Sequence, residues 1–504
     1  MFVASNPVTM RDLPYQLGDR RLILVSNREP YEHVHGAHGI EVRRPPGGVV
    51  SALDPLMRRG RGVWVAWGSG SADRDTADER GRVAVPPEDP RYTLRRIWLS
   101  SDDVDCYYES FANSALWPLC HMLAHHFEPR TDAWERYREV NERFADAVAE
   151  EAGEKSRDVA WVQDYHLALV PAALRERRPG MFIHQFWHIP FPPPDFYRLM
   201  PGGMATALLR GLLGNDLLEF HTERYARNFL ACVGELLPDL DVDMEGMRVR
   251  LGDRDVKVGA FPISIDVEHF EKLADDASAW TLGAKLRQRY ASNGRQLAVS
   301  VDRVDYTKGI PQRLRALDLM WKRHPELRKC VTFLIVATPS RSGIPAYKKL
   351  EDDVAETVRG INARYRTPDW TPILLIAENV AADRLAAIYR AADLCLVSSL
   401  QDGMNLVAKE FIASQHDERG VLLLSRFTGA AEDIEGAMLV NPFNIDGLAD
   451  GIRTALEMPQ DERKARMRRM RADLRRATIF DWLDGVMNAA SITQAARAAR
   501  EARV

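Results

Sequence analysis

Short apolar runs recur along the whole chain, and each is bounded by polar residues or by a turn that contains Gly or Pro. Segments with the apolar spacing of amphipathic helices separate these runs. Strands that alternate with helices predict βαβ units and largely parallel sheets, which is an α/β fold. The predicted strands are 21–26, 63–67, 159–163, 184–188, 217–221, 256–262, 296–301, 331–337, 372–377, 393–398, 420–425 and 437–441.

This number of strands predicts two domains, because it exceeds the usual size of one twisted sheet. The chain of 504 residues is also too long for one ordinary core. We place the junction at 261–266, where a strand ends before a helical stretch. The cleft between two domains is then the expected binding site. The polar segment 69–82 is predicted to be a flexible surface loop.

Composition narrows the class of protein. The contents of 46% hydrophobic and 28% charged residues are typical of a soluble globular protein. A net charge of −4 gives no reason to expect binding to nucleic acid or to a membrane. The five cysteines include no C-x-x-C pair and are predicted to be free thiols. The chain shows neither a signal pattern nor a membrane-spanning apolar run, which predicts a cytoplasmic protein.

The segment 401–410, QDGMNLVAKE, carries the most specific chemical pattern. It places Asp402 in a turn after the strand 393–398 and Glu410 eight positions later in a helix. Ligands bind at the carboxyl ends of strands in such sheets, and a helix N-terminus can hold a diphosphate. The two acids could therefore hold the two sugars of a nucleotide-sugar. The alternative is a capped turn with Asp402 near the N-cap.

Several cations and glycines suit phosphate groups. Arg303 and Lys308 follow the strand 296–301, and both side chains can neutralise phosphate oxygens. A solvated surface cluster is the alternative, but the position at a strand end favours a phosphate. Gly47 and Gly48 would let the backbone approach a phosphate closely, unless they form an ordinary turn.

Three further polar residues stand at strand ends. They are Asp164, His188 and Arg341. His188 lies between an apolar strand and a Pro-rich break, which makes it a better functional candidate than most histidines. The alternative for Arg341 is a local ion pair with Glu351 or Asp352.

Other patterns are set aside. The alternating acids of 239–243 resemble a calcium loop, but Met244 stands where such a loop needs glycine. His121 and His125 have helical spacing without the glutamate of a zinc-protease motif, so a half-exposed helix is predicted. The basic segment 463–476 is predicted to be a solvated helix face.

In this order, the motifs resemble the trehalose-6-phosphate synthase family, which consists of retaining glycosyltransferases of family 20. The resemblance runs from about residue 22 to about residue 483. The motifs that carry it are YY at 107–108 through LWP at 116–118, DYHL at 164–167, HIPFP at 188–192, RVDYTKG at 303–309 and DGMNLVAKE at 402–410.

The resemblance implies the GT-B fold, in which two Rossmann-like domains with parallel sheets face each other across a cleft. The domains expected from it are an acceptor domain at 1–264, a nucleotide-sugar donor domain at 265–476, and a final helix at 477–504 that crosses back to the first domain.

The resemblance also implies roles for individual residues. Catalysis would involve His188, Asp164, Arg303, Lys308 and Asp402. The donor would be bound by Gly47, Gly48, Arg303, Lys308, Val380, Asp402, Asn405, Leu406, Val407, Ala408, Lys409 and Glu410. Within this set, Asp402 would hold the transferred glucose and Glu410 the ribose. The acceptor would be bound by Arg28, Trp67, Tyr108, Trp117, Asp164 and Arg341.

The implied reaction moves glucose from a nucleoside-diphosphate glucose to glucose 6-phosphate with retention, giving α,α-trehalose 6-phosphate. No metal and no other cofactor is expected. UDP-glucose would be the donor, the protein would form a homo-oligomer, and a separate phosphatase would act on the product. Trehalose serves as an osmolyte and in stress protection.

Two departures from the family pattern leave the nucleotide open among UDP, GDP and ADP. Gln401 stands where many relatives have arginine, and Val380 stands where an aromatic residue can contact the base. The segment 28–31, REPY, also resembles glucosylglycerol-phosphate synthases, whose acceptor is glycerol 3-phosphate. Arg341 and His166 favour a sugar phosphate instead. A catalytically inactive regulatory relative is a further alternative, although every charged position that the site needs is present.

Overall fold

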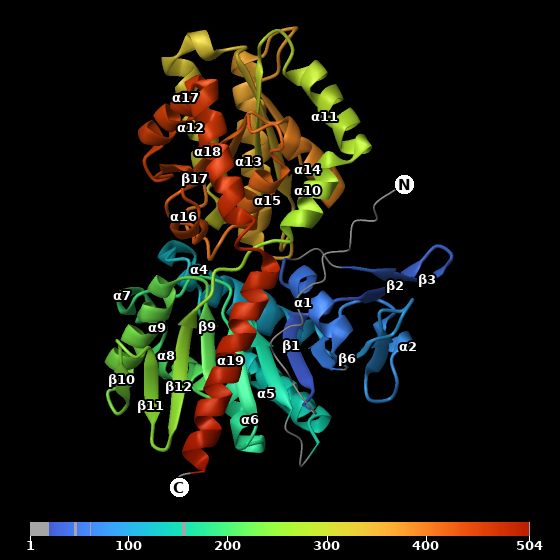
Figure 1. Ribbon diagram of the computed structural model, residues 1–504, viewed down its shortest axis with the longest axis vertical. Helices are drawn as coiled ribbons and strands as arrows, with labels where there is room; N and C mark the ends of the chain where they lie inside the picture. The colour runs from blue at the N-terminus through green and yellow to red at the C-terminus, as the bar shows by residue number, and fades with distance from the viewer. Residues whose placement is uncertain (1–19, 45–47, 61, 154–157, 503–504) are drawn as a thin grey trace, which may run out of the picture.

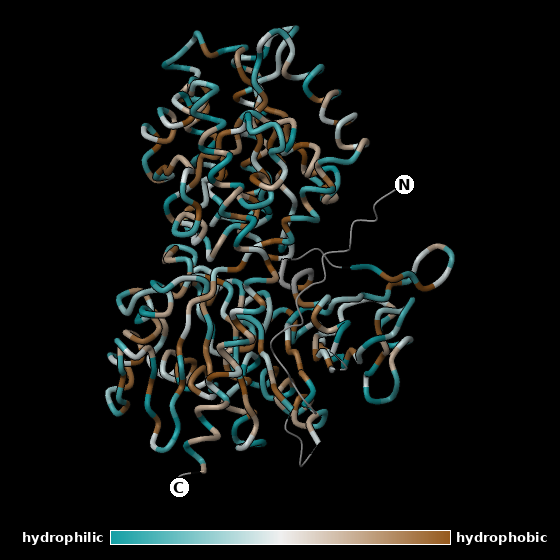
Figure 2. Tube along the Cα trace, in the orientation of Figure 1, coloured by the Kyte–Doolittle hydropathy of each residue, from teal (hydrophilic) through white to brown (hydrophobic). Residues whose placement is uncertain are grey.

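The computed structural model describes residues 20–44, 48–60, 62–153 and 158–502. Two α/β domains lie one above the other in Figure 1, and the last helix, α19 (Ile479–Glu501), runs from the upper domain along the lower one. Figure 2 shows hydrophobic positions gathered along the strands in the middle of each domain and hydrophilic positions toward the outside. Each sheet therefore lies between layers of helices, as in other α/β proteins.

The N-terminal domain contains a ten-stranded sheet with the order β10-β11-β12-β9-β8-β7-β1-β4-β6-β5. The strands from β12 to β6 in this order are parallel, and β5, β10 and β11 pair antiparallel. A separate hairpin pairs β2 with β3. The bounds are β1 (Leu22–Arg28), β2 (Glu32–Gly36), β3 (Gly39–Arg43), β4 (Val63–Trp67), β5 (Arg82–Val85), β6 (Tyr92–Ile97), β7 (Val159–Gln163), β8 (Phe182–Phe186), β9 (Leu217–Phe220), β10 (Asp241–Asp243), β11 (Arg248–Leu251) and β12 (Arg254–Ala260).

The C-terminal domain contains a six-stranded, all-parallel sheet with the order β15-β14-β13-β16-β17-β18. The bounds are β13 (Gln296–Arg303), β14 (Val331–Thr338), β15 (Ile373–Ile376), β16 (Leu394–Val397), β17 (Val421–Ser425) and β18 (Met438–Val440). The first strand of the domain, β13, lies in the middle of the sheet, as in a doubly wound Rossmann sheet, so the order in which strands are added reverses between β13 and β16. The equivalent switch point in the N-terminal sheet lies between β1 and β7.

The helices connect these strands. Those of the N-terminal domain are α1 (Gly48–Arg59), α2 (Asp73–Thr76), α3 (Ser101–Asp103), the π-helix η1 (Val104–Leu116), α4 (Trp117–Cys120), η2 (Ala124–His126), α5 (Thr131–Glu151), η3 (Tyr165–Leu167), α6 (Val170–Arg177), α7 (Pro194–Tyr197), α8 (Gly202–Leu212) and α9 (Glu223–Leu236). Those of the C-terminal domain are α10 (Val267–Asp275), α11 (Ala277–Tyr290), η4 (Tyr306–Lys308), α12 (Ile310–Arg323), η5 (Pro325–Leu327), α13 (Pro345–Tyr365), α14 (Ala382–Ala391), α15 (Leu406–Ser414), α16 (Ala430–Asp433), α17 (Ile445–Glu457) and α18 (Gln460–Leu474).

The chain crosses between the domains twice, and the two crossings are hydrogen-bonded to each other. The backbone N–H of Ile479, at the start of α19, donates to the carbonyl of Ile265 over 2.9 Å. Further along α19, Arg497 forms an ion pair with Asp216 at 3.2 Å. The last helix is thus attached to the N-terminal domain along its length.

All twelve predicted strands are present, with boundaries shifted by at most a few residues. The strands that were missed are β2, β3, β5, β6, β10 and β11. The prediction of a flexible loop at 69–82 was wrong, because this segment contains α2 and the fully buried Asp73. The half-exposed helix predicted for His121 was also wrong, since this side chain is buried at the end of α4.

The cysteines agree with expectation. Each cysteine is free, and four of the five are buried. In the described ranges, no helix is both long and apolar enough to cross a bilayer.

Candidate active site

Strand ends beside both switch points carry the predicted site residues. β1 ends at Arg28 and β7 is followed by Asp164, while β13 ends at Arg303 and β16 leads into the turn at Asp402. Contacts between the two domains bring these strand ends together. Sheet topology therefore places the site where ligands bind in this class of fold.

Asp402 and Lys308 form an ion pair on the donor side. The Lys308 Nζ lies 2.6 Å from the Asp402 Oδ2, which also accepts from the Asn405 Nδ2 at 3.1 Å and the Ser399 hydroxyl at 3.2 Å. Burial alone would raise the pKa of Asp402, but the Lys308 ammonium and the hydrogen bonds lower it to about 2. The carboxylate is therefore ionised. Within the described residues, its Oδ1 accepts no hydrogen bond and is available to a ligand.

The turn after Asp402 packs against His188 from the other domain. A Cβ atom at Gly403 would lie 2.3 Å from the His188 carbonyl oxygen, so only glycine fits there. Asn405 has a positive φ of 100° and caps α15 by accepting from the backbone N–H of Ala408 at 3.0 Å. The donor turn is thus held at a fixed position relative to His188.

His188 and Asp164 lie side by side at the ends of β8 and β7. The His188 backbone N–H donates to the Asp164 Oδ1 at 3.1 Å, and its ring Nε2 lies 2.9 Å from the Gln163 Oε1. Burial lowers the pKa of His188 well below its usual range, so the imidazole is neutral. Burial raises the pKa of Asp164 to about 7. Asp164 also has a positive φ of 69°, a strained conformation of the kind that gathers at functional sites.

Three guanidinium groups influence the Tyr108 hydroxyl. The Arg28 Nη2 donates to this hydroxyl at 3.0 Å. Burial acts to raise the pKa of Tyr108, but the charges of Arg28, Arg341 and Arg303 outweigh it and lower the pKa. The Trp67 ring lies 5.7 Å from the Tyr108 ring. This arrangement makes the space around Tyr108 strongly positive and suits an anion.

Arg341 belongs to a network that connects the two domains. Its Nη1 donates to the Asp305 Oδ2 at 3.0 Å and to the Tyr347 hydroxyl at 2.6 Å. The Trp117 indole N–H, from the other domain, donates to the Asp305 Oδ1 at 3.3 Å, and the guanidinium lies 4.1 Å from the Trp117 ring centre. The local acid is therefore Asp305, which is fully buried.

The alternative partners considered for Arg341 are occupied elsewhere. Glu351 and Asp352 both pair with Lys348. Arg341 therefore does pair with an acid, as that alternative expected, but the acid is Asp305 and not Glu351 or Asp352. Arg341 has a positive φ of 51°, like Asp164 and Asn405.

Arg303 differs from Lys308. Its side chain is exposed and lies 5.9 Å from the Trp117 ring centre. In the described part of the chain, its guanidinium makes no hydrogen bond or ion pair with the protein. The group is therefore free to bind a phosphate.

Glu410 lies about one turn along α15. The Tyr389 hydroxyl donates to its Oε2 at 2.9 Å, and burial raises the pKa of Glu410 to about 7. The side chain of the preceding residue, Lys409, is directed away from Glu410. Its Nζ contacts the Asp433 Oδ2 at 2.5 Å and the Ile263 carbonyl oxygen at 2.8 Å. The buried Lys409 side chain thus fixes the joint between the domains, and only its backbone can line a donor.

The remaining candidates are less constrained. Gln401 is buried and donates to the Tyr225 hydroxyl across the domain boundary at 3.2 Å. Leu406 and Val407 are half-buried, while Val380 and Ala408 are buried. Gly48 begins α1, and Gly47 lies outside the described residues.

Sequence reasoning assigned no role to several residues that shape this site. They are Gln163, Tyr165, Tyr225, Asp305 and Tyr347. Asp305 stands inside the 303–309 motif and Tyr165 inside the 164–167 motif, next to Gln163, so these motifs were the available signals. Tyr225 and Tyr347 contact the site from separate segments. No group of three or more potential metal ligands occurs among the described residues.

Comparison with known proteins gives a consistent result. The family model described as glycosyltransferase family 20 matches residues 20–491. A trehalose-6-phosphate synthase of Mycolicibacterium vanbaalenii is 38% identical over 479 residues, which are 94% of this chain and 96% of that protein. A bifunctional trehalose-6-phosphate synthase/phosphatase of Thermoproteus tenax is 38% identical over 472 residues, which are 92% of this chain and 62% of that protein.

Solved structures agree with these matches. The alpha,alpha-trehalose-phosphate synthase (UDP-forming) from Burkholderia xenovorans in complex with glucose-6-phosphate has a TM-score of 0.82 and 33% identity, with 94% of this chain and 100% of that chain covered. A structure described as trehalose-6-phosphate from E. coli bound with UDP-2-fluoro glucose has a TM-score of 0.82 and 29% identity, with 93% and 98% covered.

Proposed function

The chain belongs to glycosyltransferase family 20, and we propose that it transfers glucose from UDP-glucose to glucose 6-phosphate with retention, giving α,α-trehalose 6-phosphate. The predicted family and the predicted GT-B fold are confirmed. The observation that carries the proposed reaction is the convergence of Arg28, Arg303 and Arg341 on Tyr108, beside the Asp402–Lys308 pair. Guanidinium groups bind phosphates in a forked geometry, so this space suits a phosphorylated sugar.

On the donor side, Asp402 binds the hydroxyls of the transferred glucose through its free Oδ1, and Glu410 binds the ribose. Arg303 and Lys308 neutralise the diphosphate, and the N-terminus of α1 at Gly48 adds backbone N–H donors. Residues 405–409 and Val380 line the rest of the donor. The relative of known structure bound with UDP-2-fluoro glucose supports a uridine nucleotide.

In the proposed reaction, the bond between the glucose anomeric carbon and the diphosphate oxygen breaks. The new bond to the acceptor hydroxyl forms on the same face, and the leaving phosphate oxygen takes the acceptor's proton. Positive charge placed where charge develops on the leaving group lowers the barrier by several kcal/mol in such sites. The neutral His188 lies beside the anomeric carbon, and Asp164 holds the acceptor.

We also propose a location, an oligomeric state and a partner activity for the protein. The protein works in the cytoplasm. It needs no metal, because the side-chain cations of Arg303 and Lys308 supply the positive charge that a metal ion would provide at the diphosphate. It forms a homo-oligomer. A separate phosphatase removes the phosphate from the product, and the bifunctional name of the Thermoproteus tenax relative supports this pairing of activities.

Acceptor choice tests the proposal. We expect the kcat/KM of wild type for glucose 6-phosphate to be about tenfold or more above its kcat/KM for glycerol 3-phosphate. Arg341→Ala should lower the kcat/KM for glucose 6-phosphate about 100-fold. Initial rates of nucleoside diphosphate release, with UDP-, GDP- and ADP-glucose and both acceptors, give these ratios. Lys348→Ala, on the surface beside Glu351, is the matched control. Preference of wild type for glycerol 3-phosphate would assign the chain to the other branch of the family.

The pH dependence of nucleotide binding tests the role of Glu410. Ribose hydroxyls donate to a carboxylate, so the ionised form of Glu410 binds the nucleotide better. Raising the pH through its pKa of about 7 should strengthen UDP binding by wild type but not by Glu410→Gln. The Kd ratio of the variant to wild type should grow about fivefold to tenfold from about pH 6 to about pH 8. Calorimetric titration measures it, and ionisation of UDP itself cancels in the ratio. A ratio independent of pH would contradict the ribose role.

A further inference from the structure

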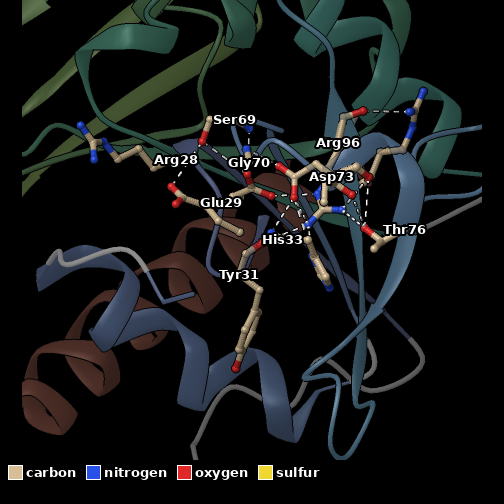
Figure 3. Close-up of polar contacts among 12 residues, drawn as sticks. Arg28, Glu29, Tyr31, His33, Ser69, Gly70, Asp73, Thr76 and Arg96 are labelled. Atoms are coloured by element: carbon tan, nitrogen blue, oxygen red, sulfur yellow. Dashed lines mark hydrogen bonds and ion pairs between the residues drawn. The ribbon is translucent and has the colours of Figure 1, made fainter. Parts of the chain in front are cut away.

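A second buried polar cluster lies beside Arg28 and has no part in the reaction described above. It consists of Glu29, His33, Asp73 and Arg96, none of which is more than 5% exposed. Figure 3 shows these side chains gathered together and the Arg28 guanidinium directed away from them. Buried charges of this kind are costly to desolvate unless their partners are well placed, so a cluster this complete needs an explanation.

The Arg96 guanidinium is the centre of the cluster. Its Nε donates to the Glu29 Oε2 at 2.8 Å, and its Nη2 lies 2.8 Å from the Asp73 Oδ1. The same Nη2 donates to the carbonyl of Tyr31 at 3.0 Å and lies 2.7 Å from the His33 Nδ1. One planar group on β6 thus fixes two segments that come from β1 and β4.

These two segments begin directly after two residues of the acceptor site. Arg28 and Trp67 are register partners at the ends of β1 and β4. The next residue after Arg28 is Glu29, whose Oε1 accepts from the backbone N–H of Ser69 at 2.8 Å. The cluster therefore ties together the two exits from which Arg28 and Trp67 project.

Asp73 makes the second exit rigid. It accepts from the backbone N–H of Gly70 at 2.6 Å and from that of His33 at 2.8 Å. A Cβ atom at Gly70 would lie 2.4 Å from the His33 carbonyl oxygen, so the loop packs too closely for any side chain there. The loop after Trp67 therefore has little freedom to move.

The charge of the cluster also matters for Arg28. Burial, together with the hydrogen bond to Asp73, raises the pKa of Glu29 far above its usual range, so this carboxyl keeps its proton near neutral pH. Burial also lowers the pKa of His33, which is neutral. The charges of Arg96 and Asp73 then balance. Because Glu29 is neutral, it does not neutralise the positive charge of Arg28, which stays available to an anion.

We propose that Arg96 is a positioning residue that, through Glu29 and Asp73, holds Arg28 and Trp67 in place for the phosphorylated acceptor. The inference rests on the proposed function, because it assumes that Arg28 and Trp67 contact the acceptor. It predicts that the cluster controls acceptor affinity and not donor affinity.

The test is Arg96→Lys, which keeps the charge but loses the fork that binds both carboxyls. We expect the KM for glucose 6-phosphate to rise about tenfold or more, while kcat at saturating acceptor and the Kd for UDP change less than about twofold. The effect should disappear in the background of Arg28→Ala, because residues that act through one another are not additive. Arg95→Lys is the matched control, since Arg95 is the next residue of β6 and pairs with Glu150 and Glu151 instead.

Every outcome bears on the proposal. An unchanged acceptor KM in Arg96→Lys, a parallel rise in the Kd for UDP, or full additivity with Arg28→Ala would each overturn it. If Arg96→Lys does not fold, Glu29→Gln leaves one acceptor oxygen in place of two at constant size, so it loses the contact either to Arg96 or to Ser69 and should raise the same KM about threefold. Wild-type transfer to glucose 6-phosphate in the same assay tests the proposed function separately. If wild type prefers another phosphorylated acceptor, the variant-to-wild-type ratio is measured with that one.

Discussion

Replacing Arg303 with alanine should lower turnover about 100-fold or more while leaving the fold intact. The side chain is exposed and, in the described ranges, bonds to no other protein group, so its loss leaves no buried partner unsatisfied. Lys308, by contrast, is already paired with Asp402 at 2.6 Å. Arg303 is therefore the cation best placed to follow the charge that develops on the leaving diphosphate.

Steady-state rates of UDP release measure this loss, and thermal unfolding checks the fold. Arg315→Ala is a control on the solvent side of α12. The same assay with EDTA addresses the metal, because fixed guanidinium and ammonium groups should make transfer independent of a divalent ion. Full activity of Arg303→Ala, or loss of wild-type activity in EDTA, is inconsistent with this mechanism.

Replacing Asp402 with alanine should abolish transfer almost completely. Its Oδ2 carries Lys308, Ser399 and Asn405, whereas its Oδ1, which accepts no hydrogen bond from the described residues, is the atom proposed to bind the glucose hydroxyls. Loss of the carboxylate leaves each of these donors without a partner, at about 1–3 kcal/mol apiece. The combined loss is about 1,000-fold or more in turnover.

Binding of UDP separates this role from that of Glu410. UDP has no transferred sugar, so Asp402→Ala should bind it within about threefold of wild type, whereas Glu410→Ala should bind it about tenfold more weakly. Asp352→Ala, an exposed acid on α13, controls for the loss of a negative charge. A large loss of UDP affinity in Asp402→Ala would place this residue at the nucleotide and not at the sugar.

The parallel strands could be predicted from the sequence because they are covered on both faces and form continuous apolar runs. β1 and β7 are of this kind. β6 was missed because Arg95 and Arg96 interrupt its apolar pattern. Arg96 is buried only because Glu29 and Asp73 reach it from other segments, and a local pattern does not contain that information.

The same reason separates the candidate residues from their partners. The ends of strands are visible in the sequence, so Asp164, Arg303 and Asp402 could be chosen as candidates. The contact between Trp117 and Asp305 spans 188 positions and both domains. The close fit of Gly403 against His188 also depends on how the domains meet. Such contacts follow from tertiary packing and not from spacing along the chain.

The structure of the product is the most direct test of the proposed function. The enzyme is incubated with UDP-glucose labelled with carbon-13 at the anomeric carbon and with glucose 6-phosphate, and the product is identified by carbon and phosphorus NMR. The account predicts one α,α-trehalose 6-phosphate for each UDP released, with the label in an α linkage. A β linkage at the labelled carbon, or release of UDP with free glucose as the only sugar product, would contradict it.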